Sequence, residues 1–318
     1  MKVLYIGNFG PEYSTENDVR KAWEHLGHEV IQAQENDLNW EQLFSYDYDL
    51  LLHTGTWADV APLTQFLDLY KGCDRLIPTA TLHLDTFWGT SRDGRHWWNE
   101  PMFHTAYIFT ADGDYQDKWK ALGKNHIWLP PAVRHDACHA GRFRSDMECD
   151  LALVGSNGDG YHEDVWTYRK QLVGALKEMA QRNGWSFRNP GGEPERFDAG
   201  KIPRSDDMND FYASAKVTVG DSLCLNKEKS LYWSDRAFEA PGRYGFLIMP
   251  QINALSTMYD DRLPMYPWGD FEMLEAMIKQ YLADPKKIAE VKADTHEIVK
   301  KNHTYVNRVE KILRIVGL

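Results

Sequence analysis

Short apolar runs alternate with amphipathic helical stretches along almost the whole chain, and this alternation constrains the fold more than any other feature. Strands that alternate with helices in this way form a parallel sheet with helices on both faces. The sequence therefore predicts an α/β protein. In the first part of the chain we expect strands at 2–6, 29–33, 49–53, 75–84 and 106–110.

The first expected helix has the clearest start and end signals. Ser14 and Thr15 mark its beginning, and Gly27 stands where a C-terminal cap belongs. Further helices are expected around 59–70 and 114–122. Apolar residues recur along the first helix at the spacing of one helical face, at Val19, Ala22, Trp23 and Leu26.

The alternation stops at residues 128–131 (Trp-Leu-Pro-Pro), where two prolines interrupt regular structure and a polar stretch runs to Met147. It then starts again, and the tail over 270–318 is expected to be helical, with breaks near Pro285 and His303. A chain of 318 residues is long enough for two domains. We expect a first domain at 1–140, a second at 141–300 and a returning helix at 301–318. The second domain is expected to hold strands at 150–154, 185–188, 216–220 and 246–249 and helices around 162–183 and 207–215.

Composition excludes several classes of protein. The formal net charge of −11 disfavours a general nucleic-acid surface, which needs an excess of Lys and Arg to bind phosphates. No apolar run approaches the ~20 residues that span a bilayer, and the apolar start at 1–7 is too short for a secretory signal. We therefore expect a cytoplasmic protein without a membrane span, whose four cysteines are free thiols.

Residues 234–250 combine a helix start, a helix stop and a buried strand. Ser234 can cap a helix on which Arg236 and Glu239, three residues apart, share one face. The helix start with Arg236 suits a diphosphate, and the Glu239 carboxylate suits ribose hydroxyls. A Pro-Gly pair at 241–242 is expected to end the helix before an apolar strand at 246–249. The loop before a buried parallel strand lies at the sheet edge where open α/β folds bind ligands.

Four stretches of the second half resemble the donor-site signature of glycosyltransferases with the GT-B fold, most closely the CgeB-like, spore-maturation type. They are residues 149–156 (CDLALVGS), 212–219 (YASAKVTV), 234–250 and 303–308 (HTYVNR). The resemblance implies an α/β protein with two Rossmann-like domains facing a cleft and a C-terminal helix that crosses back to the first domain. It also implies transfer of a sugar from a nucleotide-diphosphate sugar to a hydroxyl acceptor.

The resemblance implies which residues hold the donor. The diphosphate is expected to bind to Arg236, to the helix start at Ser234 and to the turn with Gly155 and Ser156. The ribose is expected to bind to Glu239. Arg169 matches an arginine that is frequent in the family, with a surface ion pair as the open alternative.

The chain also departs from the wider GT-B pattern. Retaining members carry a second Glu eight positions before the ribose-binding one, and Leu231 occupies that position here. The departure weakens a retaining mechanism, and the anomeric outcome stays open.

The first domain offers two candidates for a catalytic base. His83 and Asp85 are expected on one face at the end of the fourth strand. The family often has an acidic residue after this strand, so Asp85 is favoured as base or acceptor contact, followed by His83. A helix cap and a hydrogen-bonded histidine are the equally open structural alternative. The edge loop that starts at His53 has the same ambiguity.

Two further segments are expected to bind the acceptor. The turn at Gly7, Asn8 and Phe9 lacks the full dinucleotide-binding glycine spacing, so it more plausibly forms a cleft wall. Trp88 and Trp97 belong to an aromatic loop whose flat rings can stack on sugars or bases. A packed flap or a dimer contact is the open alternative.

No cofactor or metal is expected beyond the nucleotide-sugar co-substrate. The acidic pair at Asp112 and Asp114 fits a helix cap better than a metal site, and the histidines at 135 and 139 lack a second pair at zinc spacing. The acceptor can be a glycan, a small molecule or a modified DNA base. Three alternatives stay open: a DNA-base-modifying glycosyltransferase, a nucleotide-sugar epimerase or phosphorylase, and a non-catalytic nucleotide-binding module.

Overall fold

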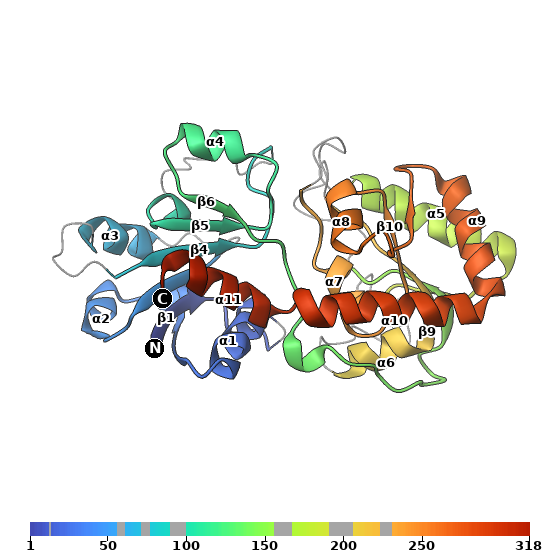
Figure 1. The fold of residues 1–318 in the computed structure, drawn as a ribbon, viewed down its shortest axis with the longest axis horizontal. Helices are drawn as coiled ribbons and strands as arrows, with labels where there is room; N and C mark the ends of the chain where they lie inside the picture. The colour runs from blue at the N-terminus through green and yellow to red at the C-terminus, as the bar shows by residue number, and fades with distance from the viewer. Residues whose placement is uncertain are drawn as a thin grey trace. The chain divides into compact units, whose positions relative to one another are not determined.

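The protein is described from a computed structural model that divides into two compact units. Unit 1 comprises Met1–Pro130 and Tyr305–Leu318, and unit 2 comprises Pro131–Thr304 (Figure 1). The domain boundaries expected at 140 and 300 stay predictions. The structure describes residues 1–12, 14–55, 61–70, 77–89, 100–155, 167–190, 206–222 and 231–318.

Unit 1 is built on a parallel sheet. Within its described residues the strand order is β2-β1-β3-β4-β5-β6, and each neighbouring pair is parallel. The sequence predicted the first five strands to within a few residues and missed β6, which has only three residues. The strands are β1 (Lys2–Gly7), β2 (Glu29–Gln34), β3 (Leu50–Thr54), β4 (Thr79–His83), β5 (Tyr107–Thr110) and β6 (His126–Trp128).

Helices follow the strands of unit 1 as the alternation predicts. The start of α1 is confirmed, because the Ser14 hydroxyl accepts a hydrogen bond from the Asn17 backbone amide at 3.2 Å. Gly27 follows the helix with φ of 80°, a backbone conformation that favours glycine. The helices are α1 (Thr15–His25), α2 (Trp40–Ser45), α3 (Ala61–Tyr70), α4 (Gln116–Ala121) and α11 (Tyr305–Val316).

Unit 2 repeats the same architecture. Its described strands lie in the order β11-β10-β9-β7-β8, again all parallel. Leu151, Val217 and Ile248 on the central strands are fully buried in one apolar core, as expected for strands covered on both faces. The strands are β7 (Cys149–Ala152), β8 (Phe187–Arg188), β9 (Ala215–Val219), β10 (Leu247–Pro250) and β11 (Met265–Tyr266).

The helices of unit 2 include the helical tail that the sequence predicted. The breaks near Pro285 and His303 are confirmed, because α10 starts at one and ends just before the other. Among the described helices, none is both long and apolar enough to cross a bilayer. The helices are α5 (Thr167–Asn183), α6 (Asp206–Ser214), α7 (Arg236–Gly242), α8 (Asn253–Met258), α9 (Phe271–Ala283) and α10 (Pro285–Asn302).

The C-terminal helix crosses back to the first domain. Helix α10 belongs to unit 2, whereas α11 belongs to unit 1 and packs against α1. The buried Arg308 on α11 donates from Nε to the Pro130 carbonyl at 2.7 Å, and Lys311 donates to the Trp128 carbonyl at 3.0 Å. These bonds satisfy backbone carbonyls that the two prolines leave without a regular ladder. The two-domain fold with a returning helix is therefore confirmed.

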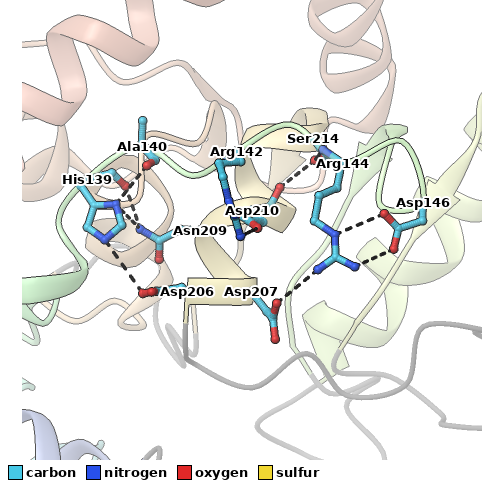
Figure 2. A network of polar contacts seen from close by, with 10 residues as sticks. All are labelled: His139, Ala140, Arg142, Arg144, Asp146, Asp206, Asp207, Asn209, Asp210 and Ser214. Atoms are coloured by element: carbon cyan, nitrogen blue, oxygen red, sulfur yellow. Dashed lines mark hydrogen bonds and ion pairs between the residues drawn. The ribbon is translucent and has the colours of Figure 1, made fainter.

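The segment after Pro131 is held on α6 of unit 2 rather than hanging between domains. Figure 2 shows the polar network that fixes it. Asp210 accepts from the Arg142 backbone amide at 2.7 Å, and Asn209 donates to the His139 carbonyl at 2.8 Å. A side chain on Gly141 would lie 2.1 Å from the Asn209 backbone carbon. Only glycine lets the two segments approach so closely.

We predict that Asp210→Ala destabilises the protein by about 1–3 kcal/mol, since a part-buried backbone amide and the Arg142 side chain lose their buried acceptor. The matched control is Asp206→Ala on the same helix. That side chain is 80% exposed and lies 4.0 Å from His139 Nε2, so the expected change is within about 0.5 kcal/mol. Urea unfolding measures both variants, and equal midpoints would contradict this account of the connector.

Candidate functional site

The candidate site of unit 2 lies where the order of strands in the sheet reverses, next to β7. From β7 the chain runs to β8 on one side and then returns to β9 on the other side of β7. In open α/β sheets, ligands bind outside the carboxyl ends of the two strands at such a switch point. The residues that follow these ends are Val154 and Gly155 after β7 and Asp221 after β9.

Two arginines share one carboxylate at this edge. Arg169 from α5 donates from Nε and, at 2.8 Å, from Nη2 to the two oxygens of Asp221. Arg236 at the start of α7 donates from Nε to the Val154 carbonyl, and its Nη1 lies 3.8 Å from Asp221 Oδ1. The side chains of Arg169 and Asp221 are buried, while 17% of Arg236 is exposed. Three elements of unit 2 thus meet in one charged cluster.

Two guanidinium groups face the Asp221 carboxylate in this cluster, and Asp235 adds a further negative charge nearby. Burial acts to raise the pKa of the Asp221 carboxyl, but Arg169 and Arg236 outweigh it and the pKa lies below its usual range. Burial and the neighbouring Arg236 lower the pKa of Arg169. A second anion beside the two guanidinium groups would relieve that repulsion.

Gly155 makes room for Arg236. A side chain at Gly155 would lie 2.6 Å from Arg236 Nη2, so only a glycine lets the guanidinium lie against this turn. The sequence analysis placed both residues in the donor site, and the structure brings them together. Ser156, the third residue expected at this turn, lies outside the described residues.

The predicted capping role of Ser234 is wrong. The residue that precedes α7 is Asp235, and the Ser234 hydroxyl donates to the Asp221 backbone carbonyl at 2.9 Å. The Pro-Gly pair also lies inside the last turn of α7, with Arg243 as the C-cap. A proline in a short helix is tolerated near an end, where few intrahelical bonds are lost. Ser234 instead ties the start of the α7 segment to the end of β9.

Glu239 is 4% exposed on α7. Its carboxylate lies 3.9 Å from Nη2 of the buried Arg243, which in turn donates to Asn209 Oδ1. The nearby Tyr212 hydroxyl is buried and has no hydrogen-bond partner among the described residues. Burial, and then Glu239, raise the pKa of Tyr212.

The sequence analysis missed Asp221 and Tyr212. A Gly-Asp pair directly after a buried strand was the available signal for Asp221, because polar residues there reach the ligand edge of a parallel sheet. Tyr212 carried no such signal, since its place beside α7 depends on how α6 packs.

The candidate edge of unit 1 lies at the equivalent switch point, between β1 and β3. The turn after β1 is braced by amides. Gln34 accepts from the Phe9 backbone amide at 2.9 Å and donates to Asn8 at 3.1 Å, and Asn17 donates to the Phe9 carbonyl at 3.1 Å. A side chain at Gly7 would lie 2.8 Å from Glu16 Cγ. Gly7, Asn8 and Phe9 therefore form a rigid turn with a carboxyl group directly beneath it.

His83 is buried at the end of β4, and its Nδ1 lies 3.1 Å from the Gly55 carbonyl. Because a carbonyl only accepts, this bond places a proton on Nδ1, so in the neutral ring the lone pair lies on Nε2. The prediction that Asp85 shares a strand face with His83 is wrong, because β4 ends at His83. Asp85 accepts from the Thr86 backbone amide at 2.8 Å. Its catalytic role stays a prediction.

Trp88 is 6% exposed and packs edge-on against Phe87 and Trp119, with ring centroids 5.0 and 5.1 Å apart. It belongs to the apolar cluster that also contains Met102 and Phe103. This packing matches the open alternative of a packed flap, and the stacking role of Trp88 stays a prediction. Trp97 lies outside the described residues.

Among the described residues, no group of three or more His, Cys, Asp and Glu side chains could hold a metal ion. Cys138 and Cys149 are buried free thiols, and burial raises the pKa of the Cys149 thiol to about 12.

We predict that Asp221→Ala destabilises the protein by about 3–5 kcal/mol, because it leaves two guanidinium groups without their shared countercharge. The control is Asp294→Ala, which removes the exposed ion pair with Arg262 and should cost less than about 1 kcal/mol. Thermal and urea unfolding measure both. Similar losses of stability in the two variants would mean that the Asp221 cluster contributes no more to folding than an exposed ion pair.

Comparisons with known proteins agree with this geometry. Residues 167–314 match the family described as glycosyl transferase-like, whereas no curated protein sequence matches. An alpha-glucosyltransferase structure, in complex with UDP and a 13-mer DNA, superimposes with a TM-score of 0.73 at 12% identity, covering 100% of both chains.

Two other similar structures have bacterial sources. The alpha,alpha-trehalose 6-phosphate synthase from Burkholderia multivorans gives a TM-score of 0.64 at 12% identity over 99% of both chains. S. aureus MnaA with UDP gives 0.57 at 10% identity over 100% of this chain and 98% of that one. At such identities the similarity establishes the fold alone. The chain thus has the two-domain fold of GT-B glycosyltransferases, and its residues 167–314 match a glycosyl transferase-like family model; the CgeB-like subgroup is not confirmed.

Proposed function

We propose that this protein transfers a sugar from a nucleotide-diphosphate sugar to a hydroxyl acceptor, with the donor bound by unit 2. The observation that carries the proposal is the cluster of Arg169, Arg236 and Asp221 at the switch point of the sheet. Two of the similar structures contain UDP, which supports a nucleotide donor.

The donor's diphosphate would complete the charge balance of the cluster. Two guanidinium groups share one carboxylate, and Arg236 retains an exposed fraction through which a phosphate could reach it. Gly155, Ser156 and Ser234 would line the same phosphate position. Arginine charges that are fixed before the reaction stabilise a leaving diphosphate, and on this basis we propose a reaction that needs no metal.

Glu239 is proposed to bind the ribose. Its carboxylate lies 3.9 Å from Nη2 of Arg243. A carboxylate offers about four lone-pair positions, so it can accept from two ribose hydroxyls in addition to its other contacts. The buried Tyr212 hydroxyl is a further hydrogen-bonding group near this position.

The acceptor is proposed to bind at the edge of unit 1. His83 is the better-placed base of the two candidates, because its Nδ1 bond orients the ring and its neutral form carries the lone pair on Nε2. Asp85 would assist, and Gly7, Asn8, Phe9, Trp88 and Trp97 are the proposed acceptor contacts. Closure of the two units around both substrates would exclude water from the donor.

Two finer assignments accompany this proposal. The stretch at 303–308 supports the CgeB-like subgroup, and the free thiols Cys138 and Cys149 support a reducing compartment such as the cytoplasm.

A modified base in DNA is the second candidate acceptor. The full-length similarity to a structure that contains DNA favours it, while the net charge of −11 disfavours it. A mobility-shift assay with duplex DNA at low salt distinguishes a DNA acceptor from the other hydroxyl acceptors. Release of an epimerised donor without any acceptor would instead identify an epimerase.

We predict that Arg236→Ala and Glu239→Ala each weaken UDP binding by about 10–100-fold, through lost hydrogen bonds to charged groups. Isothermal titration calorimetry measures the affinity. Arg262→Ala, an exposed arginine of the same unit, is the control and should leave it unchanged. Unaltered UDP affinity in both test variants would remove the donor-site assignment.

We also predict that His83→Gln lowers kcat by about 10²–10⁴-fold while UDP affinity stays at the parent value, because His83 lies in unit 1. His25→Gln, on the exposed end of α1, serves as the control. Turnover with labelled nucleotide sugar measures the effect. An unchanged kcat in His83→Gln would mean that another group acts as the base.

A further inference from the structure

The edge of unit 1 holds polar groups that the fold itself does not use. Glu35 is the first residue after β2, and its side chain is half-buried. Among the described residues, no hydrogen bond or ion pair engages its carboxyl group. His53 at the end of β3 is 3% exposed, and neither of its ring nitrogens has a partner there. Buried polar groups are usually paired, so these two call for a ligand.

Glu35 and His53 border the same point in space. A Cβ placed on Gly55 would lie 2.6 Å from His53 Nε2 and 3.8 Å from Glu35 Oε2. The glycine therefore leaves the edge open between an imidazole and a carboxyl group. Both groups lie beside the switch point of the sheet, the position at which α/β folds bind ligands.

A second carboxyl group lies beside the first. Glu16 sits under Gly7, and burial raises its pKa, with Glu35 contributing in the same direction. Burial also raises the pKa of Glu35. Contacts with the Asn8 backbone and the Ser14 hydroxyl partly offset the effect on Glu16. The two carboxyl groups are thus close enough to repel one another.

No basic side chain balances these groups in the part of the chain that is described. The main influences on the pKa of Glu16 and Glu35 include no Lys or Arg. Burial, with the neighbouring His83, lowers the pKa of His53 to about 3, so its ring is neutral at pH 7. The edge therefore combines carboxyl oxygens with a neutral imidazole, the reverse of the guanidinium cluster in unit 2.

From this contrast we propose that Glu35, Glu16 and His53 form the acceptor subsite and select a neutral, hydroxyl-rich acceptor of the carbohydrate class over a phosphorylated one. The inference rests on the proposed function of the site. Carboxyl oxygens accept hydrogen bonds from neighbouring hydroxyls, and the imidazole can donate or accept. Among the described residues, a phosphate would meet the two carboxyl groups, and no Lys or Arg is among the main influences on them.

The test is a binding titration of the full-length protein by NMR. The probes are methyl α-glucoside and maltose as neutral ligands, glucose 6-phosphate, and a duplex containing 5-hydroxymethylcytosine. Each is titrated with and without saturating UDP. We expect at least one neutral sugar to bind about tenfold more tightly than either phosphate-bearing probe, and Glu35→Gln to weaken it by about tenfold. Glu35→Arg should reduce the difference in affinity between the neutral sugar and the phosphate-bearing probes.

The matched control is Glu29→Gln, at the opposite, amino end of the same strand β2, which should leave sugar binding unchanged. Tighter binding of glucose 6-phosphate or of the duplex would overturn the proposal, as would no binding of either neutral sugar or no effect of Glu35→Gln. UDP titrated alone reports separately on the proposed function. Failure of UDP to bind would contradict the donor site, while the sugar titration without UDP still decides the acceptor class.

Discussion

The shared carboxylate of Asp221 is the interaction on which the site of unit 2 depends. It lies just past β9, receives two hydrogen bonds from Arg169 of α5, and stands 3.8 Å from Arg236 of α7. Taking three charged groups out of water is costly, and only close pairing offsets that cost. The cluster consequently holds one strand end and two helices in a single arrangement.

The same cluster carries the proposed binding of an anion. Arg169 and Arg236 lie close to the same carboxylate at a sheet edge, and Arg236 retains access to solvent. A diphosphate bound there, as proposed, would place negative charge beside both guanidinium groups.

The two units use one architecture with opposite chemistry. Each has a parallel sheet that changes direction next to its first strand, β1 in unit 1 and β7 in unit 2. Guanidinium groups gather at one of these edges, and carboxyl groups with the neutral imidazole of His53 at the other. This division suits the proposed transfer from a charged donor to a neutral acceptor, because the same group cannot favour both.

Local sequence patterns determined the class of this protein. The periodicity of apolar residues decides which segments are strands or helices, and it identified most elements, the breaks at Pro285 and His303, and the cap at Ser14. The resemblance to the GT-B family, not periodicity, placed Arg169, Arg236 and Gly155 in one predicted site. These features depend on neighbours within a few residues, which is why a single sequence reveals them.

Tertiary structure alone decided what those residues face. The Ser234 hydroxyl does not cap α7 but donates to the Asp221 backbone carbonyl. Trp88 packs inside an aromatic cluster. Glu16, Glu35 and His53 meet although they come from a helix and two strand ends that lie apart in the sequence. Such meetings depend on strand order and register, and no local spacing encodes which strand ends become neighbours.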